Sequence, residues 1–192
     1  QEGIFQHFSA IAQETDKPII LYSIPSRCIV DISIATVERL AAKYSNIRHI
    51  KESGGDVGRV DELKIAMGDD ITVLSGDDSL TLAFIASGAE GVISVASNIL
   101  PAEVTALVDA ALGGDLKHAA AIHRMLYPIF RDLFIEPNPV PVKLCLKKLG
   151  IFSTDRVRLP LCQISDEGRP AVLKTLANVL ANIEASATAN AS

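Results

Sequence analysis

The sequence predicts an α/β fold in which a parallel sheet is followed by a helical region. Short apolar runs of strand length alternate with segments of helical periodicity as far as Ala96, and from residue 101 onward the periodicity is helical throughout. Strands that alternate with helices form parallel sheets with right-handed crossovers, which are either doubly wound or closed into a barrel. Four strands do not distinguish these two architectures. No stretch rich in Pro, Gly or Ser interrupts the chain, so a single domain is expected.

Each predicted strand is an apolar run bounded by turn residues. The four runs are IILYSIP at 19–25, IRHIKES at 47–53, ITVLSG at 71–76 and GVISVA at 91–96. Runs of this kind are typical of strands buried on both faces. The helices that precede them are expected over residues 2–15, 33–44, 57–67 and 78–87.

The second part of the chain is predicted to be helical, over residues 101–112, 115–133, 139–149 and 166–184. Within it, the segment EPNPVPVK has three prolines between 137 and 141, which predicts a stiff, extended turn entering a helix. The last residues, 185–192, are small and polar and are expected to form a flexible tail.

The composition excludes several classes of function. The chain has 192 residues, 48% of them hydrophobic and 21% charged, with a formal net charge of −5 and no cluster of Lys and Arg. Nucleic acids and anionic membranes need such clusters, so small molecules or other proteins are the expected partners. Three widely spaced cysteines and the absence of a long apolar run indicate a cytoplasmic protein. The start at Gln1, without Met and directly in helical periodicity, indicates a segment of a longer protein.

Ligands of parallel α/β sheets collect at the carboxyl ends of the strands, where this sequence places Tyr22, Lys51, Ser75 and Ser94. Lys51 is the strongest candidate. A lysine within an apolar strand loses hydration, which favours its neutral, nucleophilic form and suits attack on a ketone carbonyl. The structural alternative, which position alone favours, is a strand-end lysine that reaches solvent or pairs with Glu52.

Three further residues surround this candidate. Tyr22 is expected at the same depth on the preceding strand, where a phenol can relay protons, although a half-buried structural tyrosine is the commoner case. Arg27, in the loop PSRC, can grip a carboxylate through two parallel hydrogen bonds, but most loop arginines contact solvent or a nearby acid. His49 lies two residues before Lys51 and therefore on the same strand face, where a neutral core histidine is expected.

The remaining motifs indicate chemistry without a metal. The segment SGDD at 75–78 offers backbone N–H groups to an anion, although capping of the next helix is the favoured role for Asp77 and Asp78. Neither the cysteines nor the histidines have metal-ligand spacing, and the sequence contains no GxGxxG or Walker pattern.

Taken together, six segments occur in the order seen in the dihydrodipicolinate synthase family, which this chain resembles up to its tail: LYSIPSR, HIKESGGD, LSGDD, GVISVASN, EPNPVPVKLCLKKLG and RLPLCQISDEGR. The resemblance implies a (β/α)8 TIM barrel, of which residues 1–100 are the C-terminal half with strands five to eight. It further implies that residues 101–184 are the last barrel helix and a C-terminal helical extension, with the tail at 185–192.

The resemblance also implies an activity: condensation of pyruvate with aspartate semialdehyde on the route to diaminopimelate and lysine. Lys51 resembles the lysine that forms an imine with pyruvate, Tyr22 the proton-relaying tyrosine, and Arg27 the arginine that receives the aldehyde's carboxylate. Ile93 resembles the strand-eight residue whose backbone lines the pyruvate pocket, and Gly76 and Asn138 resemble pocket-wall positions. No cofactor is implied, and the family is commonly a homotetramer.

Arg27 helps to choose within the superfamily, because the related N-acetylneuraminate lyases share the Tyr and Lys but usually lack Arg after Pro-Ser in this loop. Two departures concern the pocket: His49 stands where the family usually has a small residue, and Cys28-Ile29 replaces the more usual Thr-Gly.

About four further strands, on the order of 110 residues, are expected before Gln1. They normally include the GTTGE loop for the pyruvate carboxylate, two proton-relay residues and the lysine feedback site. The fragment alone is therefore expected to be inactive. The alternatives are another pyruvate-dependent aldolase of the superfamily, a non-catalytic half-barrel that associates through its open sheet edges, and a small doubly wound binding domain.

Overall fold

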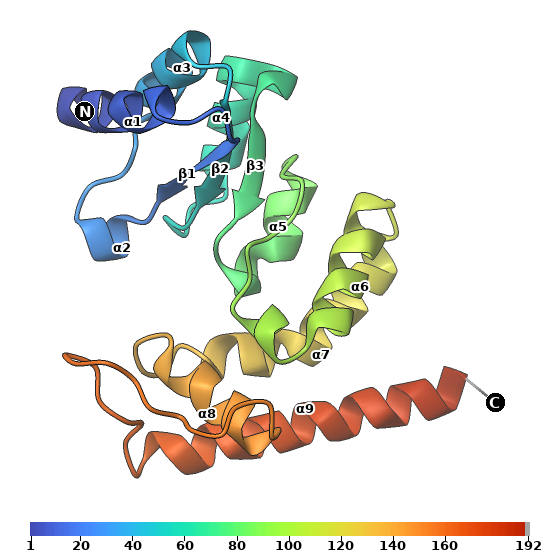
Figure 1. Ribbon diagram of the computed structural model, residues 1–192. Coiled ribbons are helices and arrows are strands. Elements are labelled where there is room, and N and C mark those ends of the chain that lie inside the picture. Colours follow the sequence, from blue (N-terminus) through green and yellow to red (C-terminus); the bar gives the residue numbers. More distant parts are fainter. Residues whose placement is uncertain (191–192) are drawn as a thin grey trace. The chain divides into compact units, whose positions relative to one another are not determined.

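The computed structural model describes residues 1–190 (Figure 1). The chain forms two compact units, Gln1–Ile93 and Ser94–Ser192. The second unit begins with the short 3-10 helix η3 (Ala96–Asn98), which packs against the first long helix of that unit.

The first unit is built on a parallel sheet of three strands in the order β1-β2-β3. Its elements in chain order are α1 (Glu2–Gln13), β1 (Ile19–Ser23), α2 (Pro25–Cys28), α3 (Ile34–Lys43), β2 (Ile47–Glu52), α4 (Gly58–Met67), η1 (Gly68–Asp70), β3 (Thr72–Ser75), η2 (Asp78–Leu80) and α5 (Thr81–Ala86). The helices and the first three strands lie where the sequence predicts them, apart from α2, which was expected to be a loop.

The helices cover one face of this sheet. Leu21, Ile50 and Val73 point to that face and are fully buried. They form one core with apolar side chains of the helices, among them Val37, Leu40, Leu63 and Phe84. The opposite face stays partly open within this unit, since Ile20 and Tyr22 keep 45% and 44% of their exposure. The prediction of strands buried on both faces is therefore wrong for this unit.

The predicted fourth strand is only a single bridge between Ser75 and Val92. The amide of Glu90 donates to the carbonyl of Val73 (2.8 Å), and the amide of Ile93 donates to the carbonyl of Ser75 (2.8 Å). A regular parallel ladder advances by equal steps on both strands, whereas here three residues on one side match two on the other. This extra residue lies beside Gly91, whose φ of 153° suits glycine. The bulge interrupts the ladder, which ends the strand.

α2 ends in a backbone conformation that its residue disfavours. Pro25 begins this helical turn, as its fixed φ allows, and Ile29 ends it with a φ of 66° in the left-handed region. A β-branched residue in this region costs about 1–2 kcal/mol. The usual Gly of the resembling family at this position would carry no such cost, so the departure at Ile29 has a physical consequence.

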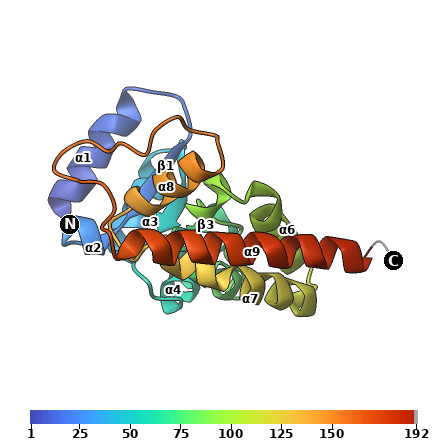
Figure 2. The same cartoon turned by 90° about the horizontal axis from the view of Figure 1, so that it is seen from below.

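The second unit contains helices and no strand within the part of the chain that the structure describes, and residues 149–167 form a long irregular connection. After η3, its helices are α6 (Pro101–Leu112), α7 (Leu116–Asp132), α8 (Val140–Lys148) and α9 (Gly168–Asn190). α9 packs along α7 and α8 (Figure 2), and the hydroxyl of Thr175 donates to the Asp132 carboxylate over 2.6 Å to join α9 to α7.

The helical boundaries agree with the predicted ones except at the C-terminus. α9 continues to Asn190 where a tail was expected from residue 185, because every second residue there is alanine, which favours helix most strongly. Residues 191 and 192 of the expected tail lie outside the described residues. The proline-rich segment forms the predicted turn into α8, and this turn is tight rather than extended, because the amide of Val140 donates to the carbonyl of Pro137 (3.0 Å). Among residues 1–190, no helix is both long and apolar enough to cross a bilayer.

His123 on α7 is expected to make the stability of the protein depend on pH. The ring of His123 lies between those of Tyr127 and Phe130, with centroids 6.0 and 5.9 Å away. Burial lowers the pKa of His123, and the nearby charge of Arg124 lowers it further. The unfolded chain therefore binds this proton more readily than the folded one, and stability is lost as the pH falls below the ordinary histidine value.

We expect the free energy of unfolding to decrease between pH 7.5 and 6.0, and His123→Gln to flatten this decrease, as measured by urea denaturation at each pH. The exposed His118 on the same helix offers the control His118→Gln, which should leave the slope unchanged. An equal slope in wild type and His123→Gln would contradict the prediction.

Relief of backbone strain at position 29 is a second expectation. The Ile29 side chain is 93% exposed, so Ile29→Gly removes the left-handed penalty with little loss of packing and should stabilise the protein by about 1 kcal/mol. Ile65 is similarly exposed (85%) but lies within α4, where Ile65→Gly should destabilise by about 0.5 kcal/mol. Thermal or urea denaturation checks both signs. Two destabilised variants would show that position 29 carries no strain.

Candidate functional site

Lys51 and Tyr22 lie side by side at the carboxyl end of the sheet. They are direct partners in the register of β1 and β2, which is the common depth that the sequence predicted. The Nζ atom of Lys51 lies over the Tyr22 ring, 4.2 Å from its centroid, in a cation–π arrangement. Lys51 is half-buried rather than enclosed, so the loss of hydration expected for it is partial. The pair faces the open side of the sheet, where a small molecule can reach both groups.

Gly76 forms the floor beside Lys51. A Cβ atom at this position would lie 3.0 Å from Cε of Lys51 and would collide with the hydroxyl of Ser53. The amide of Gly76 donates to the carbonyl of Glu52 (2.7 Å), which holds the backbone in this close approach. Only a glycine leaves space here for Lys51 and Ser53 together. The sequence singled out Gly76 but gave no sign that Ser53 shares this space.

Ser53 carries a buried hydroxyl at the end of β2. Its residue is 7% exposed, and its Oγ atom makes no hydrogen bond to any described residue. Buried polar atoms are nearly always paired, so such a hydroxyl next to Lys51 is available to a bound molecule.

Asp77 supplies the electrostatic counterpart of Lys51. Burial raises the pKa of the Asp77 carboxyl, the neighbouring charge of Asp78 raises it further, and the charge of Lys51 lowers it. Asp77 is the N-cap residue of η2 and Asp78 its first residue, as the capping role predicts, but the Asp77 side chain makes no capping hydrogen bond. A carboxyl group that keeps its proton to higher pH beside an amine can take part in proton transfer. The position of Asp77 directly after the end of β3 is the sequence feature that could have marked it as a site residue.

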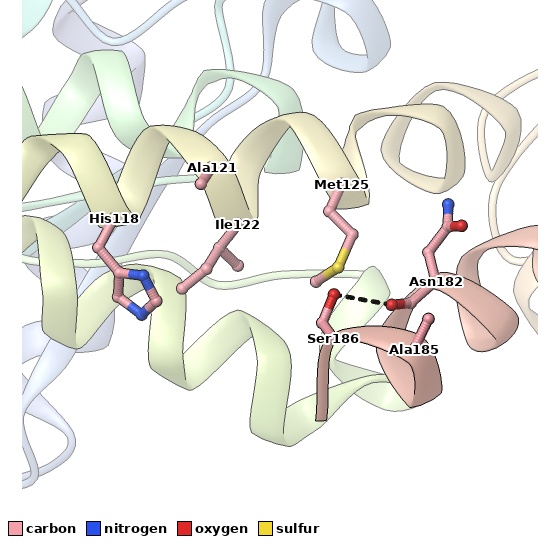
Figure 3. A pocket seen from close by; sticks show the side chains of 7 residues that line it. All are labelled: His118, Ala121, Ile122, Met125, Asn182, Ala185 and Ser186. Atoms are coloured by element: carbon pink, nitrogen blue, oxygen red, sulfur yellow. Dashed lines mark hydrogen bonds between the residues drawn. The ribbon is translucent and has the colours of Figure 1, made fainter. Parts of the chain in front are cut away.

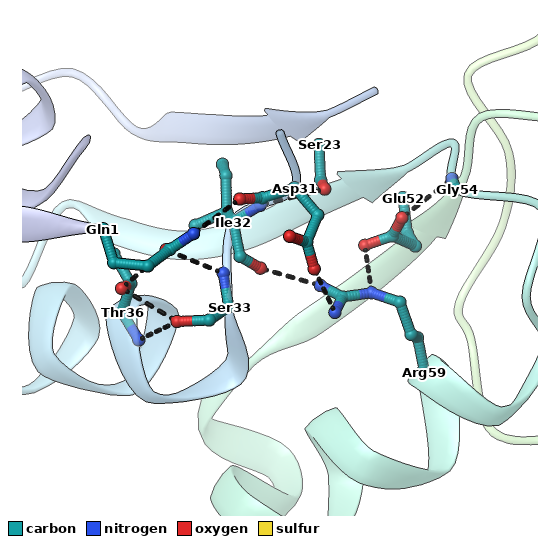
Figure 4. A network of polar contacts seen from close by, with 9 residues as sticks. All are labelled: Gln1, Ser23, Asp31, Ile32, Ser33, Thr36, Glu52, Gly54 and Arg59. Carbon is teal, nitrogen blue, oxygen red and sulfur yellow. Dashed lines mark hydrogen bonds and ion pairs between the residues drawn. The ribbon is translucent and has the colours of Figure 1, made fainter. Parts of the chain in front are cut away.

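Glu52 does not pair with Lys51, which was one of the two forms of the structural alternative. Its carboxylate is fully buried on the opposite face of β2, where Nε of Arg59 donates to it over 2.9 Å (Figure 4). Burial raises the pKa of Glu52, while the Arg59 charge and hydrogen bond and the amide of Gly54 lower it. Neither Glu52 nor Arg59 was assigned a role from the sequence, although strand alternation already separates Glu52 from Lys51.

The other residues predicted for the site are divided between the two units, with Arg27 and Ile93 in the first and Asn138 in the second. Arg27 lies on α2, just after the carboxyl end of β1 and therefore at the same edge of the sheet as Lys51, and it is exposed. Ile93 is the last residue of the first unit, bonded through its amide to Ser75 and 37% exposed. Asn138 belongs to the second unit, directly before the cis peptide bond to Pro139.

The contacts of Ser75, Ser94 and His49 are with neighbouring residues of the fold. Ser75 is fully buried on the helix side of the sheet, and its hydroxyl donates to the carbonyl of Asp77 (2.9 Å). Ser94 begins the second unit, and its hydroxyl accepts from the amide of Ser97 (2.8 Å). His49 shares the face of Lys51, as predicted, but it is half-exposed and pairs with Ile20 and Thr72 rather than lying in the core.

A separate groove lies between α7 and α9 in the second unit (Figure 3). Its volume is about 530 Å³, and it is lined by His118, Ala121, Ile122, Met125, Asn182, Ala185 and Ser186. None of the predicted site residues lines it. Across residues 1–190, no three His, Cys, Asp or Glu side chains are grouped so that they could hold a metal ion.

The close approach at Gly76 predicts a cost for any side chain there. Gly76→Ala should destabilise the protein by about 1–3 kcal/mol, because the new methyl group must displace Ser53 or Lys51. The control Gly3→Ala places a methyl group in open space on α1 and should stabilise by about 0.5–1 kcal/mol. Denaturation curves of both variants check the prediction, and equal effects of the two substitutions would refute the crowding.

Known proteins are similar to this chain in sequence and in fold. The model of the dihydrodipicolinate synthetase family matches residues 1–179. The 4-hydroxy-tetrahydrodipicolinate synthase of Aquifex aeolicus is 47% identical over 176 residues, and that of Escherichia coli is 45% identical over the same length. Each match covers 92% of this chain and 60% of the relative.

A solved structure of the 4-hydroxy-tetrahydrodipicolinate synthase from Methylacidiphilum fumariolicum superposes with a TM-score of 0.92 at 49% identity, over 95% of this chain and 62% of that one. The chain thus spans about 60% of the length of the curated relatives it matches. The match extends through both units, from α1 into α9, and includes the segment that holds Lys51, Tyr22 and Gly76. This chain belongs to the dihydrodipicolinate synthetase family.

Proposed function

We propose that the protein to which this chain belongs condenses pyruvate with L-aspartate semialdehyde to give 4-hydroxy-tetrahydrodipicolinate, in the synthesis of diaminopimelate and lysine. The observation that carries this proposal is the placement of Lys51 beside Tyr22 at the carboxyl end of the sheet, in a chain of this family. The relatives bear the name of this activity. Because the chain spans about 60% of their length, the activity is assigned to the whole protein and the 192 residues supply part of its site.

Lys51 is the nucleophile of the proposed reaction. Its Nζ atom attacks the keto carbon of pyruvate, and the keto oxygen leaves as water to give an imine. The positive imine nitrogen then draws the electron pair of a methyl C–H bond into a C=C bond, and the proton passes to a base. The resulting enamine carbon attacks the aldehyde carbon, whose oxygen gains a proton. The amine of the aldehyde substrate finally displaces Lys51 from the imine carbon and closes the ring.

Tyr22 is placed to relay protons in these steps. Its ring centroid lies 4.2 Å from Nζ of Lys51, which supports the proposal that its hydroxyl exchanges protons with the departing keto oxygen. Arg27, at the same edge of the sheet, is proposed to bind the carboxylate of the aldehyde through its planar guanidinium. Gly76, Ile93 and Asn138 are proposed as the pocket wall. The imine at Lys51 provides the electron sink, so no cofactor is required.

The sheet is proposed to form half of a (β/α)8 barrel. Its open face carries Ile20, Tyr22 and Lys51, which would line the interior once further strands close the barrel, and the helices already cover the outer face. The single bridge from Ser75 to Val92 is proposed to mark the place of the fourth strand of this half. Assembly into a homo-oligomer is part of the same proposal.

Covalent trapping tests the function directly. The full-length protein, incubated with pyruvate and reduced with borohydride, should gain the mass of one reduced pyruvate unit, and peptide mapping should place it on Lys51. Lys51→Arg should abolish the adduct and lower kcat at least a thousandfold, since the guanidinium stays protonated and is no nucleophile. The control Lys43→Arg changes an exposed lysine of α3 and should leave the adduct unchanged. An active protein without label on Lys51 would refute the proposal.

A further inference from the structure

The contacts of the ion-pair network hold the base of the loop that carries Arg27. This loop leaves β1 at Ser23 and returns through Asp31 and Ile32, and the amide of Ile32 approaches the Ser23 hydroxyl to 3.4 Å. Between these points the side chains from Ser26 to Val30 are exposed. The two held ends of the loop therefore contribute to the place of Arg27.

Arg59 holds the returning end of the loop. Its guanidinium donates to the carbonyl of Ile32 (2.8 Å) and to the Asp31 carboxylate (3.2 Å), and through Nε to Glu52 (2.9 Å) (Figure 4). These three bonds use the fork of the guanidinium in three directions, which an ammonium group cannot reproduce. The Arg59 side chain is 13% exposed, so these contacts are largely shielded from solvent.

The inner end of this connection lies next to Lys51. Glu52 follows Lys51 on β2, and its buried carboxylate also accepts from the amide of Gly54 (2.8 Å), which fixes it to the strand end. Ser53, the residue between them, donates its amide to the carbonyl of Ser23, where the Arg27 loop departs. Arg59 thus joins the strand end that presents the amine to the loop that presents the guanidinium.

The loop needs such an anchor because its own backbone opposes its shape. Ile29 has a φ of 66°, which a β-branched residue disfavours, and this strained residue lies between Arg27 and the anchored Asp31. A strained conformation persists where the surroundings over-determine it, and the bonds of Arg59 supply that determination.

We propose that Arg59 is a positioning residue, which through Asp31 and Ile32 sets the place of Arg27 and thereby the affinity for a carboxylate-bearing aldehyde. This inference rests on the proposed function. Arg59 acts through the loop and touches neither substrate, so its loss should affect the aldehyde and leave the chemistry of pyruvate with Lys51 intact.

The test compares two substitutions in the full-length protein. Arg59→Lys keeps the charge but loses the fork, and it should raise the KM for the aldehyde substrate about tenfold or more. Asp31→Asn removes only the outer contact, at a side chain that is 46% exposed, and should raise this KM about threefold without endangering the fold. For both variants, kcat and the KM for pyruvate should stay within about twofold of wild type, since the Lys51 site is unchanged.

Glu2→Gln is the matched control, because Arg39 and Glu2 form an exposed ion pair in the same unit at 2.9 Å. It should alter neither KM. Borohydride trapping with pyruvate tests the proposed function separately from the positioning role of Arg59. An adduct on Lys51 in wild type and in both variants supports the proposed function, independently of the KM measured for the aldehyde. Unchanged KM for the aldehyde in Asp31→Asn and a folded Arg59→Lys, or equal increases for both substrates, would overturn the positioning role. Failure of trapping in wild type would instead refute the proposed function.

Discussion

Neighbouring residues of a β-strand must point to opposite faces of its sheet, and on β2 this rule separates Lys51 from Glu52. Lys51 faces the open side together with Tyr22, where water and small molecules reach it. Glu52 faces the helices and is fully buried, so it needs a cationic partner from the same side. Arg59 on α4 meets this need. The alternation therefore keeps the carboxylate from neutralising the amine that the proposed chemistry uses.

The crowding at the strand ends follows from the same arrangement. Lys51 and Ser53 are two residues apart and share a face, and β3 must pass close to both as it ends. Gly76 permits this approach because it has no Cβ atom. In the segment SGDD, the lack of a side chain at Gly76 therefore leaves the space that Lys51 and Ser53 occupy. Asp77, one residue later, adds a carboxyl group whose burial raises its pKa beside Lys51.

Sequence reasoning reached the features that depend on local periodicity and order. Strand ends predicted the common depth of Tyr22 and Lys51, and helical periodicity placed α6, α7 and α8 within a residue at either end. It failed where a tertiary contact decides the outcome. The bulge beside Gly91 ends the fourth strand, and Arg59 bridges to Glu52 and the returning loop, a contact between separate segments that no spacing rule reveals. The predicted C-terminal helix ends too early, at residue 184, because small polar residues are typical of a tail, whereas the alanines among them favour helix.

The energetics of Glu52 and Arg59 indicate what this buried pair contributes. The pKa of Glu52 is raised, with burial as the largest cause, even though Arg59 lies at bonding distance. The cost of removing a carboxylate from water commonly offsets what a buried ion pair returns, so such a pair is weak evidence for stability. Loss of Arg59 would remove its directed bonds to Asp31 and Ile32, which join the Lys51 strand end to the returning end of the strained loop. The pair is therefore better understood as a geometric constraint on that loop than as a source of stability.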